Sequence, residues 1–268
     1  MSRRRWLIPL AALVVAVAPA LASTAASAST QSSRALAIQP GGTAQHVIKP
    51  GTAALGAHSG LRTEVSSTNW SGYAADSGTY TSVSASWVQP TGTCTSATRY
   101  SSFWVGLDGY DSSTVEQTGT DTDCVDGSPQ YYGWYEMYPA DSFNFGDTVK
   151  PGDTITASVV YEGSNEYKLS LADSTQGWSV STTKTLAGAA RSSAEVIIEA
   201  PCCTNSGGIL PLADFGTVNV SDSVVDGDPI GDLSPVQIIM QDSSGKDKDT
   251  VSSLSAEENF SATWERAS

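Results

Sequence analysis

Three segments of the chain place carboxylate and amide groups among aromatic side chains. They are residues 103–109 (FWVGLDG), 114–119 (TVEQTG) and 130–139 (QYYGWYEMYP). A fourth segment, residues 193–199 (SAEVIIE), carries two glutamates. The only histidines are His46 and His58, so the chain from Glu64 onward contains none. That part cannot use Ser–His or Cys–His chemistry or most zinc sites, so carboxylates, amides and aromatic groups must carry any reaction.

The two glutamates of the fourth segment, Glu195 and Glu199, are four residues apart. In a strand they share one face but lie about 13 Å apart, at about 3.3 Å per residue. Carboxylates that work as an acid–base pair are closer than this, so each glutamate needs a partner from another strand. Glu116 and Gln117 are adjacent and point to opposite faces of a strand, so only one of them can line a given cleft.

The segments that must position these groups have the pattern of β-strands. Apolar residues alternate with polar ones in four rows: Val83, Ala85 and Trp87; Ile155, Ala157, Val159 and Tyr161; Tyr167, Leu169 and Leu171; Val236, Ile238 and Met240. Turn clusters such as Asp108–Gly109 and Pro151–Gly152 separate the rows, and helical periodicity is almost absent. The 205 residues from Glu64 to Ser268 therefore predict one all-β domain, an antiparallel β-sandwich with many short strands.

Charge divides the chain at Glu64. The first 63 residues contain no Asp or Glu, whereas residues 64–268 carry 28 acidic and 8 basic residues, a formal charge of −20. This excess of negative charge argues against nucleic acid as a partner of the body.

The first 22 residues have the parts of a secretory signal peptide. Arg3, Arg4 and Arg5 precede an apolar stretch over residues 6–18, and cleavage signatures follow at residues 20–22 (ALA) or 26–28 (ASA). The stretch is short for a membrane span of about 20 residues, and Pro9 interrupts it. No later apolar run is long enough to cross a bilayer. We therefore predict a signal peptide over residues 1–22, export to the extracellular space and no membrane anchor.

Residues 23–63 are rich in Ala, Ser, Thr, Gly and Gln and contain no Phe, Tyr or Trp. Such a segment cannot build a packed core, and the sequence alone leaves it as a disordered tail or a removable prosegment. Its cations Arg34, Lys49 and Arg62 favour a basic prosegment that lies on the acidic body as its inhibitor. Acid would release it, because carboxylates with a pKa near about 4 become protonated.

Four cysteines in an exported chain predict disulfides. Of the three connectivities we favour Cys94–Cys124, because these residues flank the most aromatic strand pair. Cys202 and Cys203 then form a vicinal disulfide or remain free thiols. Without histidine, these cysteines predict no metal site.

The chemistry-bearing segments resemble, in order and spacing, those of the glutamic endopeptidases, or eqolisins. The likeness rests on residues 104–109 (WVGLDG), 117–119 (QTG), 134–139 (WYEMYP) and 194–199 (AEVIIE), with residues 69–72 (NWSG) similar to the start of the mature domain. It covers essentially the whole body, and four motifs in order with compatible gaps are specific. The resemblance implies a bent, concanavalin-like β-sandwich of two antiparallel sheets, made as a preproprotein and active in acid.

The same resemblance implies that Gln117 and Glu199 are the catalytic pair, with Glu195 a neighbour on the same face. It assigns substrate-binding roles to seven residues: Trp70, Trp104, Asp108, Asp121, Trp134, Glu136 and Tyr138. Met137 stands where fungal relatives typically have an aromatic residue, and residues 120–122 and 200–203 also differ from the fungal pattern. In these positions the chain looks more like bacterial members, and the differences concern the subsites more than the pair.

The chemistry of this pair is coherent without the family name. An ionised Glu199 can take a proton from a water that attacks the scissile carbonyl and return it to the leaving nitrogen. The amide of Gln117 can donate a hydrogen bond to the developing oxyanion at any pH. We therefore expect a secreted, monomeric acid endopeptidase acting on polypeptides without a metal or cofactor.

Three other functions are alternatives to a glutamic endopeptidase. An aspartic protease needs two facing Asp-Thr/Ser-Gly loops, and only one occurs, at residues 76–78 (DSG). A glycosidase would pair two of the body's glutamates, such as Glu116, Glu136, Glu195 and Glu199. The main alternative is a non-catalytic, lectin-like β-sandwich that binds carbohydrate on its Trp and Tyr side chains.

Overall fold

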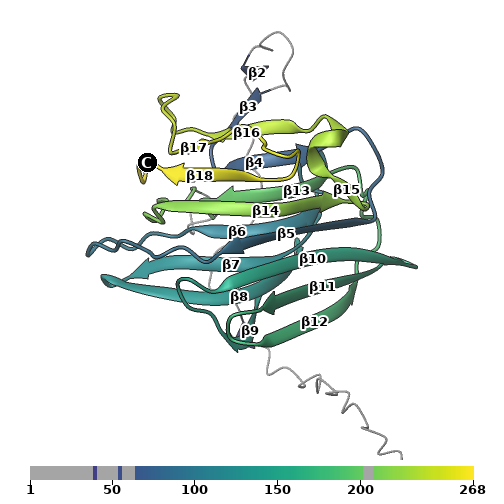
Figure 1. The fold of residues 1–268 in the computed structure, drawn as a ribbon, viewed down its shortest axis with the longest axis horizontal. Helices are drawn as coiled ribbons and strands as arrows, with labels where there is room; N and C mark the ends of the chain where they lie inside the picture. Colours follow the sequence, from purple (N-terminus) through teal and green to yellow (C-terminus); the bar gives the residue numbers. More distant parts are fainter. Residues whose placement is uncertain (1–38, 41–53, 56–63, 202–207) are drawn as a thin grey trace, which may run out of the picture. The chain divides into compact units, whose positions relative to one another are not determined.

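The computed structural model describes residues 39–40, 54–55, 64–201 and 208–268. The predicted signal peptide, most of the predicted prosegment and the Cys202–Cys203 pair lie outside these residues. The described body consists of two stacked β-sheets and one short 3-10 helix, η1 (Ile230–Leu233) (Figure 1). The predicted all-β sandwich is confirmed.

The larger sheet has ten strands. Their spatial order is β1 (Gln39–Pro40), β9 (Phe143–Thr148), β8 (Ser128–Tyr138), β7 (Val115–Val125), β6 (Ser102–Leu107), β13 (Ala194–Glu199), β4 (Trp70–Ala75), β16 (Val236–Met240), β3 (Glu64–Ser67) and β2 (Ala54–Leu55). Every neighbouring pair is antiparallel except β3 and β16, which are parallel. Strands that meet in the centre come from distant parts of the chain, so this sheet can gather residues from all four chemistry-bearing segments.

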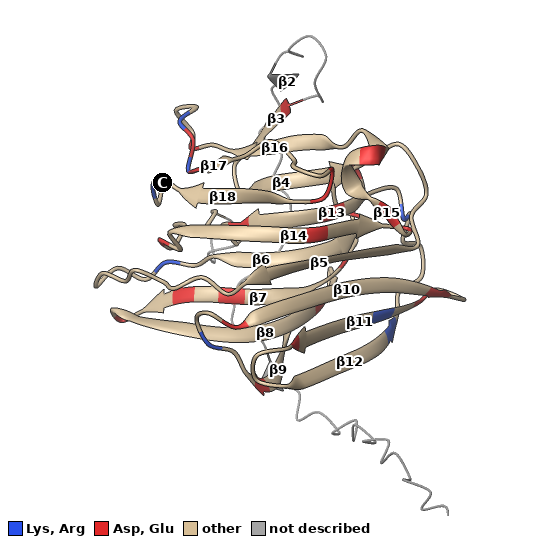
Figure 2. Cartoon of the chain, viewed as in Figure 1, with Lys and Arg blue, Asp and Glu red and all other residues tan. Residues whose placement is uncertain are grey.

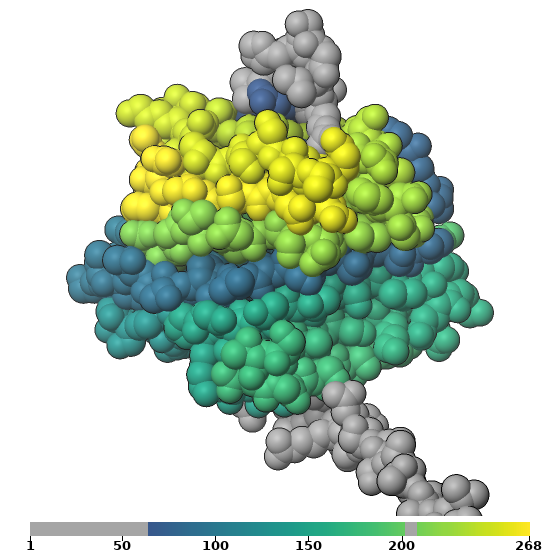
Figure 3. Space-filling view, in the orientation of Figure 1, coloured from purple at the N-terminus to yellow at the C-terminus, as the bar shows by residue number. Residues whose placement is uncertain are grey.

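The smaller sheet has eight strands. Seven follow the spatial order β12 (Trp178–Thr185), β11 (Glu166–Asp173), β10 (Thr154–Gly163), β5 (Ser82–Val88), β14 (Thr217–Val225), β18 (Phe260–Trp264) and β17 (Asp249–Val251), and β15 (Asp228–Pro229) pairs with β14. On the face seen in Figure 3, β5 forms a blue band between segments from much later in the sequence.

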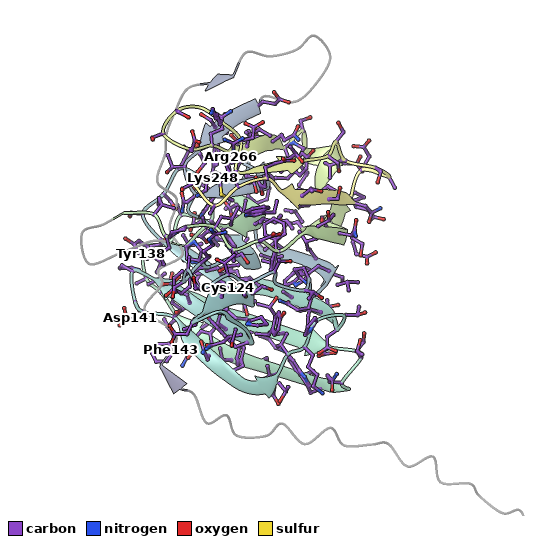
Figure 4. All side chains as sticks on the ribbon, turned by 90° about the vertical axis from the view of Figure 1, so that its left-hand side faces the viewer. Cys124, Tyr138, Asp141, Phe143, Lys248 and Arg266 are labelled. Atoms are coloured by element: carbon purple, nitrogen blue, oxygen red, sulfur yellow. A yellow bond between two sulfur atoms is a disulfide. The ribbon has the colours of Figure 1, made fainter. Side chains whose placement is uncertain are left out.

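The main core lies between the two sheets and follows the predicted alternation. Ile155, Ala157 and Val159 of β10 are fully buried, whereas the residues between them are exposed or half-buried. In the register with β5, Ile155 lies opposite Trp87 and Ala157 opposite Ala85. Figure 4 shows side chains filling the space between the sheets. Period-two burial of this kind is what a sandwich strand with one solvated face requires.

The central strands β4, β6 and β13 differ because every residue in them is buried. Their second face carries its own apolar cluster on the outer side of the ten-stranded sheet: Trp70, Ala74, Trp104, Val115, Trp134, Ile197, Val236 and Ile238. This aromatic layer on the outer face, with polar groups between its rings, is the platform of the candidate site described below.

Cys94 and Cys124 form a disulfide, with their Cα atoms 5.4 Å apart, so that prediction is confirmed. It joins the loop before β6 to the end of β7, and the backbones of Arg99 and Cys124 also exchange hydrogen bonds of 2.8 and 2.9 Å. The cross-link therefore fixes the loop that leads into two of the site strands.

Among the described residues, no helix is long and apolar enough to cross a membrane.

Candidate active site

The register of strands β13, β6, β7 and β8 defines three rows of side chains on the outer face of the ten-stranded sheet. The first row is Glu195, Gly106, Gln117 and Glu136; the second is Ile197, Trp104, Gly119 and Trp134; the third is Glu199, Ser102, Asp121 and Tyr132. Residues directly opposite one another in a sheet point to the same side. Both predicted catalytic residues and four of the seven predicted substrate residues lie in these rows, and Trp70 and Tyr138 belong to the same face.

Glu199 is fully buried, and each of its carboxylate oxygens accepts a hydrogen bond. Trp104 Nε1 donates to Oε2 at 2.8 Å, and Asn69 Nδ2 donates to Oε1 at 3.2 Å. The two donors come from opposite sides of β13, since Trp104 lies on β6 and Asn69 directly precedes β4. Hydrogen bonds to a carboxylate favour its charged form and offset the cost of burying it.

Gln117 is also fully buried, and its side-chain amide is hydrogen-bonded to Glu136, its neighbour in the row. Gln117 Nε2 donates to Glu136 Oε2 at 2.7 Å. Glu136 was predicted to bind substrate, but this contact makes it in the first place an anchor for Gln117. The bond fixes the amide nitrogen, which is the hydrogen-bond donor of the predicted pair.

Glu199 and Gln117 are not direct cross-strand neighbours, because Glu199 lies opposite Asp121 and Gln117 opposite Glu195 through β6. The Trp104 indole connects the two rows. Its Nε1 reaches Glu199, and its Cζ3 lies 2.8 Å from the position that a Cβ on Gly106 would occupy. Gln117 Cβ is 3.2 Å from that same position. The Trp104 indole thus extends from the Glu199 carboxylate to the backbone of Gly106, beside Gln117. Residue 106 must be glycine, because any side chain there would collide with the ring.

Trp70 adds a second indole beside Trp104 on this face. Trp70 lies opposite Glu199, yet its Cη2 is 3.0 Å from the Cβ position of Gly109, beyond the far end of β6. Asp108 and Gly109, with φ values of 68° and 106°, turn the chain after β6, and this turn lies against the Trp70 indole. The Trp70 and Trp104 rings meet edge to face, with centroids 4.8 Å apart and an interplanar angle of 76°. They form one wall of the site.

Asp121 is bound on both of its oxygens by aromatic residues of β8. Trp134 Nε1 donates to Oδ1 at 2.6 Å, and the Tyr132 hydroxyl lies 2.8 Å from Oδ2. The same hydroxyl lies 2.6 Å from Asp123 Oδ2. Tyr132 and Asp123 were missed from the sequence, although the alternation of Asp121 with Asp123 on β7 was a usable signal. The nearby carboxylates and burial raise the pKa of Tyr132, so its proton stays on the hydroxyl.

The chain is similar to known proteins over most of its body. The sequence model of the Peptidase A4 family matches residues 68–264. The chain belongs to the Peptidase A4 family. A scytalido-glutamic peptidase, solved with a transition-state analog inhibitor, is 27% identical, has a TM-score of 0.66, and covers 74% of this chain and 98% of its own. This chain is therefore a glutamic-type endopeptidase, a hydrolase of peptide bonds.

Two further structures are similar to this peptidase. SCP-B, a member of the eqolisin family solved with the tripeptide Ala-Ile-His, is 25% identical with a TM-score of 0.61, over 74% of this chain and 98% of its own. The aspergilloglutamic peptidase from Aspergillus niger is 25% identical with a TM-score of 0.55, over 62% and 99%. A comparison with the curated proteins finds no match.

In this peptidase Asp108 has the contacts of a structural anchor. Its carboxylate accepts the backbone N–H groups of Arg191 at 2.7 Å and Ser192 at 2.9 Å, and the Ser192 hydroxyl at 3.2 Å. Asp108 itself has a φ of 68°, a conformation that aspartate tolerates better than most residues. These bonds tie the turn after β6 to the start of β13, so Asp108 fixes the strand that carries Glu199. Tyr138, another predicted substrate residue, is half-buried at the end of β8 and packs against the outer aromatic cluster (Figure 4).

Two buried carboxyl groups near the site of the peptidase have no hydrogen-bond partner among the described residues. Glu116 points into the core, and burial, helped by the charge of Asp108, raises the pKa of Glu116 to about 9. Glu195 lies on the site face, and burial raises the pKa of Glu195 well above its ordinary value. Burial therefore favours the neutral, protonated form of both groups.

Asp and Glu outnumber Lys and Arg in the body of the peptidase, and both kinds are scattered over its strands and turns (Figure 2). Among the described residues, no three His, Cys, Asp or Glu side chains are placed to hold a metal ion. The chemistry available on this face therefore consists of carboxyl, amide, hydroxyl and indole groups.

Proposed function

We propose that this peptidase is a secreted acid endopeptidase in which Glu199 is the general base and Gln117 stabilises the oxyanion. Glu199 takes a proton from a water as that water attacks the scissile carbonyl carbon, and later gives the proton to the leaving nitrogen. The observation that carries this proposal is the pair of hydrogen bonds that the Glu199 carboxylate accepts from Asn69 and Trp104. A carboxylate with a donor on each oxygen, on the same sheet face as an anchored glutamine, is equipped to stay ionised in acid.

Gln117 suits the oxyanion because its amide keeps its hydrogens at every pH. The amide nitrogen has two of them. One is donated to Glu136, which orients the group, and we assign the other to the oxygen that becomes negative in the transition state. The contact with Glu136 supports this assignment because an oriented donor has no reorganisation cost at the moment of reaction.

An extended polypeptide is the substrate that this face favours. Trp70, Trp104 and Trp134 give flat apolar walls, and Tyr138 extends the aromatic surface. We assign the subsites to these four residues together with Asp121 and Glu136, and we assign Asp108 a supporting role instead, because of its contacts with residues 191 and 192. The central strands of this sheet already pair with a neighbour on each side. The side chains of the enzyme, and not its strand backbones, would therefore hold the substrate.

The test is an assay of the acid-treated protein on an unfolded protein substrate. We expect hydrolysis in the acid range that pepstatin-type inhibitors do not block, because no aspartic dyad is involved. Gln117→Ala should lower kcat about 10²–10³-fold, the usual cost of one lost oxyanion donor, with little change in KM. A lectin-like module would instead bind polysaccharide without proteolysis at any pH. Full activity of folded Gln117→Ala would remove the glutamine from the mechanism.

We further propose that the predicted signal peptide, residues 1–22, is removed on export and that residues 23–63 restrain the enzyme until acid weakens their attraction to the body. The strands β1 and β2 both come from this segment and pair with β9 and β3, toward opposite edges of the ten-stranded sheet. Pairing at both edges of this sheet supports a prosegment that is held against the body.

We expect the precursor to show a lag in activity after acidification, because the attraction to the body weakens only as its carboxylates are protonated. The lag is measured by following peptide hydrolysis after a jump from pH 7 to pH 3. The variant with Arg34, Lys49 and Arg62 all changed to Gln should shorten it. A synthetic peptide of residues 23–63 should inhibit the mature enzyme near pH 6 and not at pH 3. If there is no lag and the peptide does not inhibit, residues 23–63 are only a tail.

A further inference from the structure

We propose that Asn69 is a positioning residue for Glu199: its side-chain amide holds the carboxylate in place and favours its ionised state, and Ser67 fixes which way that amide faces. This inference rests on the proposed role of Glu199 as the base. It adds two residues to the machinery, neither of which was assigned a function from the sequence.

The contact between the two side chains is direct and completely buried. Asn69 Nδ2 donates to Glu199 Oε1 at 3.2 Å, and all three residues Ser67, Asn69 and Glu199 are at most 1% exposed. The backbone holds the pair in register, because the N–H of Ala200 donates to the Asn69 carbonyl at 2.8 Å and Trp70 lies opposite Glu199. Asn69 is therefore fixed relative to the glutamate at the level of the sheet.

Ser67 determines the orientation of the Asn69 amide. Its hydroxyl oxygen accepts the backbone N–H of Trp70 at 3.1 Å and that of Asn69 at 3.3 Å. The hydroxyl hydrogen is thereby directed to Asn69 Oδ1, 3.3 Å away. With its carbonyl oxygen held on this side, the amide presents its NH2 group to Glu199. The flipped amide would place an oxygen against the carboxylate and would lose both bonds.

The second donor to Glu199 cannot serve as a clean probe of this function. Trp104 Nε1 donates to Oε2 at 2.8 Å, but its ring also forms the wall of the proposed substrate cleft. Replacing Trp104 would change binding and positioning together. Asn69 contributes its donor from outside the aromatic wall, so its loss should affect the ionisation of Glu199 and leave substrate contacts in place.

The expected effect is a shift of the acid limb of the pH profile. A hydrogen bond to a charged group stabilises the charged form more than the neutral form, and its loss raises the pKa of the carboxyl group. Loss of the Asn69 amide should therefore move the acid limb of kcat/KM upward by about one to two pH units. KM at the optimum should change little, because Asn69 is not proposed to contact the substrate.

The experiment uses the full chain after acid activation, with kcat/KM measured between pH 2 and pH 6. Asn69→Ala should show the upward shift, and Asn69→Asp a larger one, because it keeps the shape but opposes Glu199 with a second acid. Ser67→Ala should shift the limb in the same direction by less. Asn219→Ala, an exposed amide on β14, is the matched control and should leave the profile unchanged.

The outcomes separate this inference from the proposed function. If folded Asn69→Asp and Ser67→Ala both keep the wild-type acid limb while Glu199→Gln is inactive, the positioning role is wrong and the base assignment stands. If Glu199→Gln is active, the base assignment is wrong and the inference falls with it. Thermal unfolding at the assay pH shows which variants are folded, and Ser67→Ala carries the test if Asn69→Ala is not.

Discussion

Glu199→Gln should lower kcat/KM for peptide hydrolysis by about 10²–10⁴-fold while the protein keeps its fold, because the general base is removed and the shape of the side chain is retained. The amide still fits between Trp104 Nε1 and Asn69 Nδ2, since its carbonyl oxygen accepts one of the two bonds. What is lost is the group that takes the proton from water. The measurement is steady-state hydrolysis of an unfolded protein in acid, with circular dichroism to confirm the fold.

Glu195→Gln is the matched control for this result. Glu195 lies on the same strand and the same sheet face, and through Gly106 it is the cross-strand neighbour of Gln117. Burial raises the pKa of Glu195 well above its ordinary value, so the residue is already a neutral acid and an amide should replace it with little loss of activity. If Glu195→Gln were inactive and Glu199→Gln active, the two glutamates would have exchanged roles and our assignment would be wrong.

Glu116→Gln should make the folded protein markedly less sensitive to neutral pH. Burial raises the pKa of Glu116 from 4.5 to about 9, so between these values the folded state keeps a proton that the unfolded chain releases. A raised pKa gives stability that is fully present below about pH 4.5 and is lost as pH rises toward 9. At about 1.4 kcal/mol per pH unit, roughly 3 kcal/mol is lost by pH 7. Glutamine does not titrate, so the variant should retain this stability.

The measurement is the free energy of unfolding in urea at pH 4 and pH 7, for the wild type and the variant. The two proteins should be similar at pH 4 and should differ by up to about 3 kcal/mol at pH 7. Glu166→Gln, an exposed glutamate on β11, is the control and should not alter the difference between the two pH values. Equal losses for wild type and Glu116→Gln would show that Glu116 is not the group responsible.

A second group should reinforce this dependence on acid. Asp249 is fully buried on β17, and burial raises the pKa of Asp249 to about 7, opposed by its bond from the Ser71 hydroxyl and by the charge of Lys248. Lys248 is adjacent to Arg266, whose N–H donates to the Lys248 carbonyl at 3.1 Å (Figure 4). The body thus contains carboxyl groups that stabilise the fold most when they are protonated, which agrees with the proposed activity in acid.

Several properties of this protein were determined by the sequence alone. The lack of histidine after residue 63 excluded most hydrolytic chemistries, and the period-two rows around Ala85 and Ala157 predicted the sandwich core. Alternation also placed Glu116 and Gln117 on opposite faces, whereas the Cys94–Cys124 disulfide was the favoured one of three connectivities. These are local properties, since alternation and spacing along one strand depend only on backbone geometry.

The tertiary structure decided how the strands align, and therefore which groups meet. No local pattern places Glu199 opposite Trp70 and Gln117 beside Glu136, because register is set by pairing between strands up to 130 residues apart in the chain. For the same reason the anchoring role of Asp108 and the contact of Asn69 with Glu199 were not visible in the sequence. A strand specifies which face each of its side chains takes, but its neighbours across the sheet depend on long-range packing, and that packing is what assembles the site.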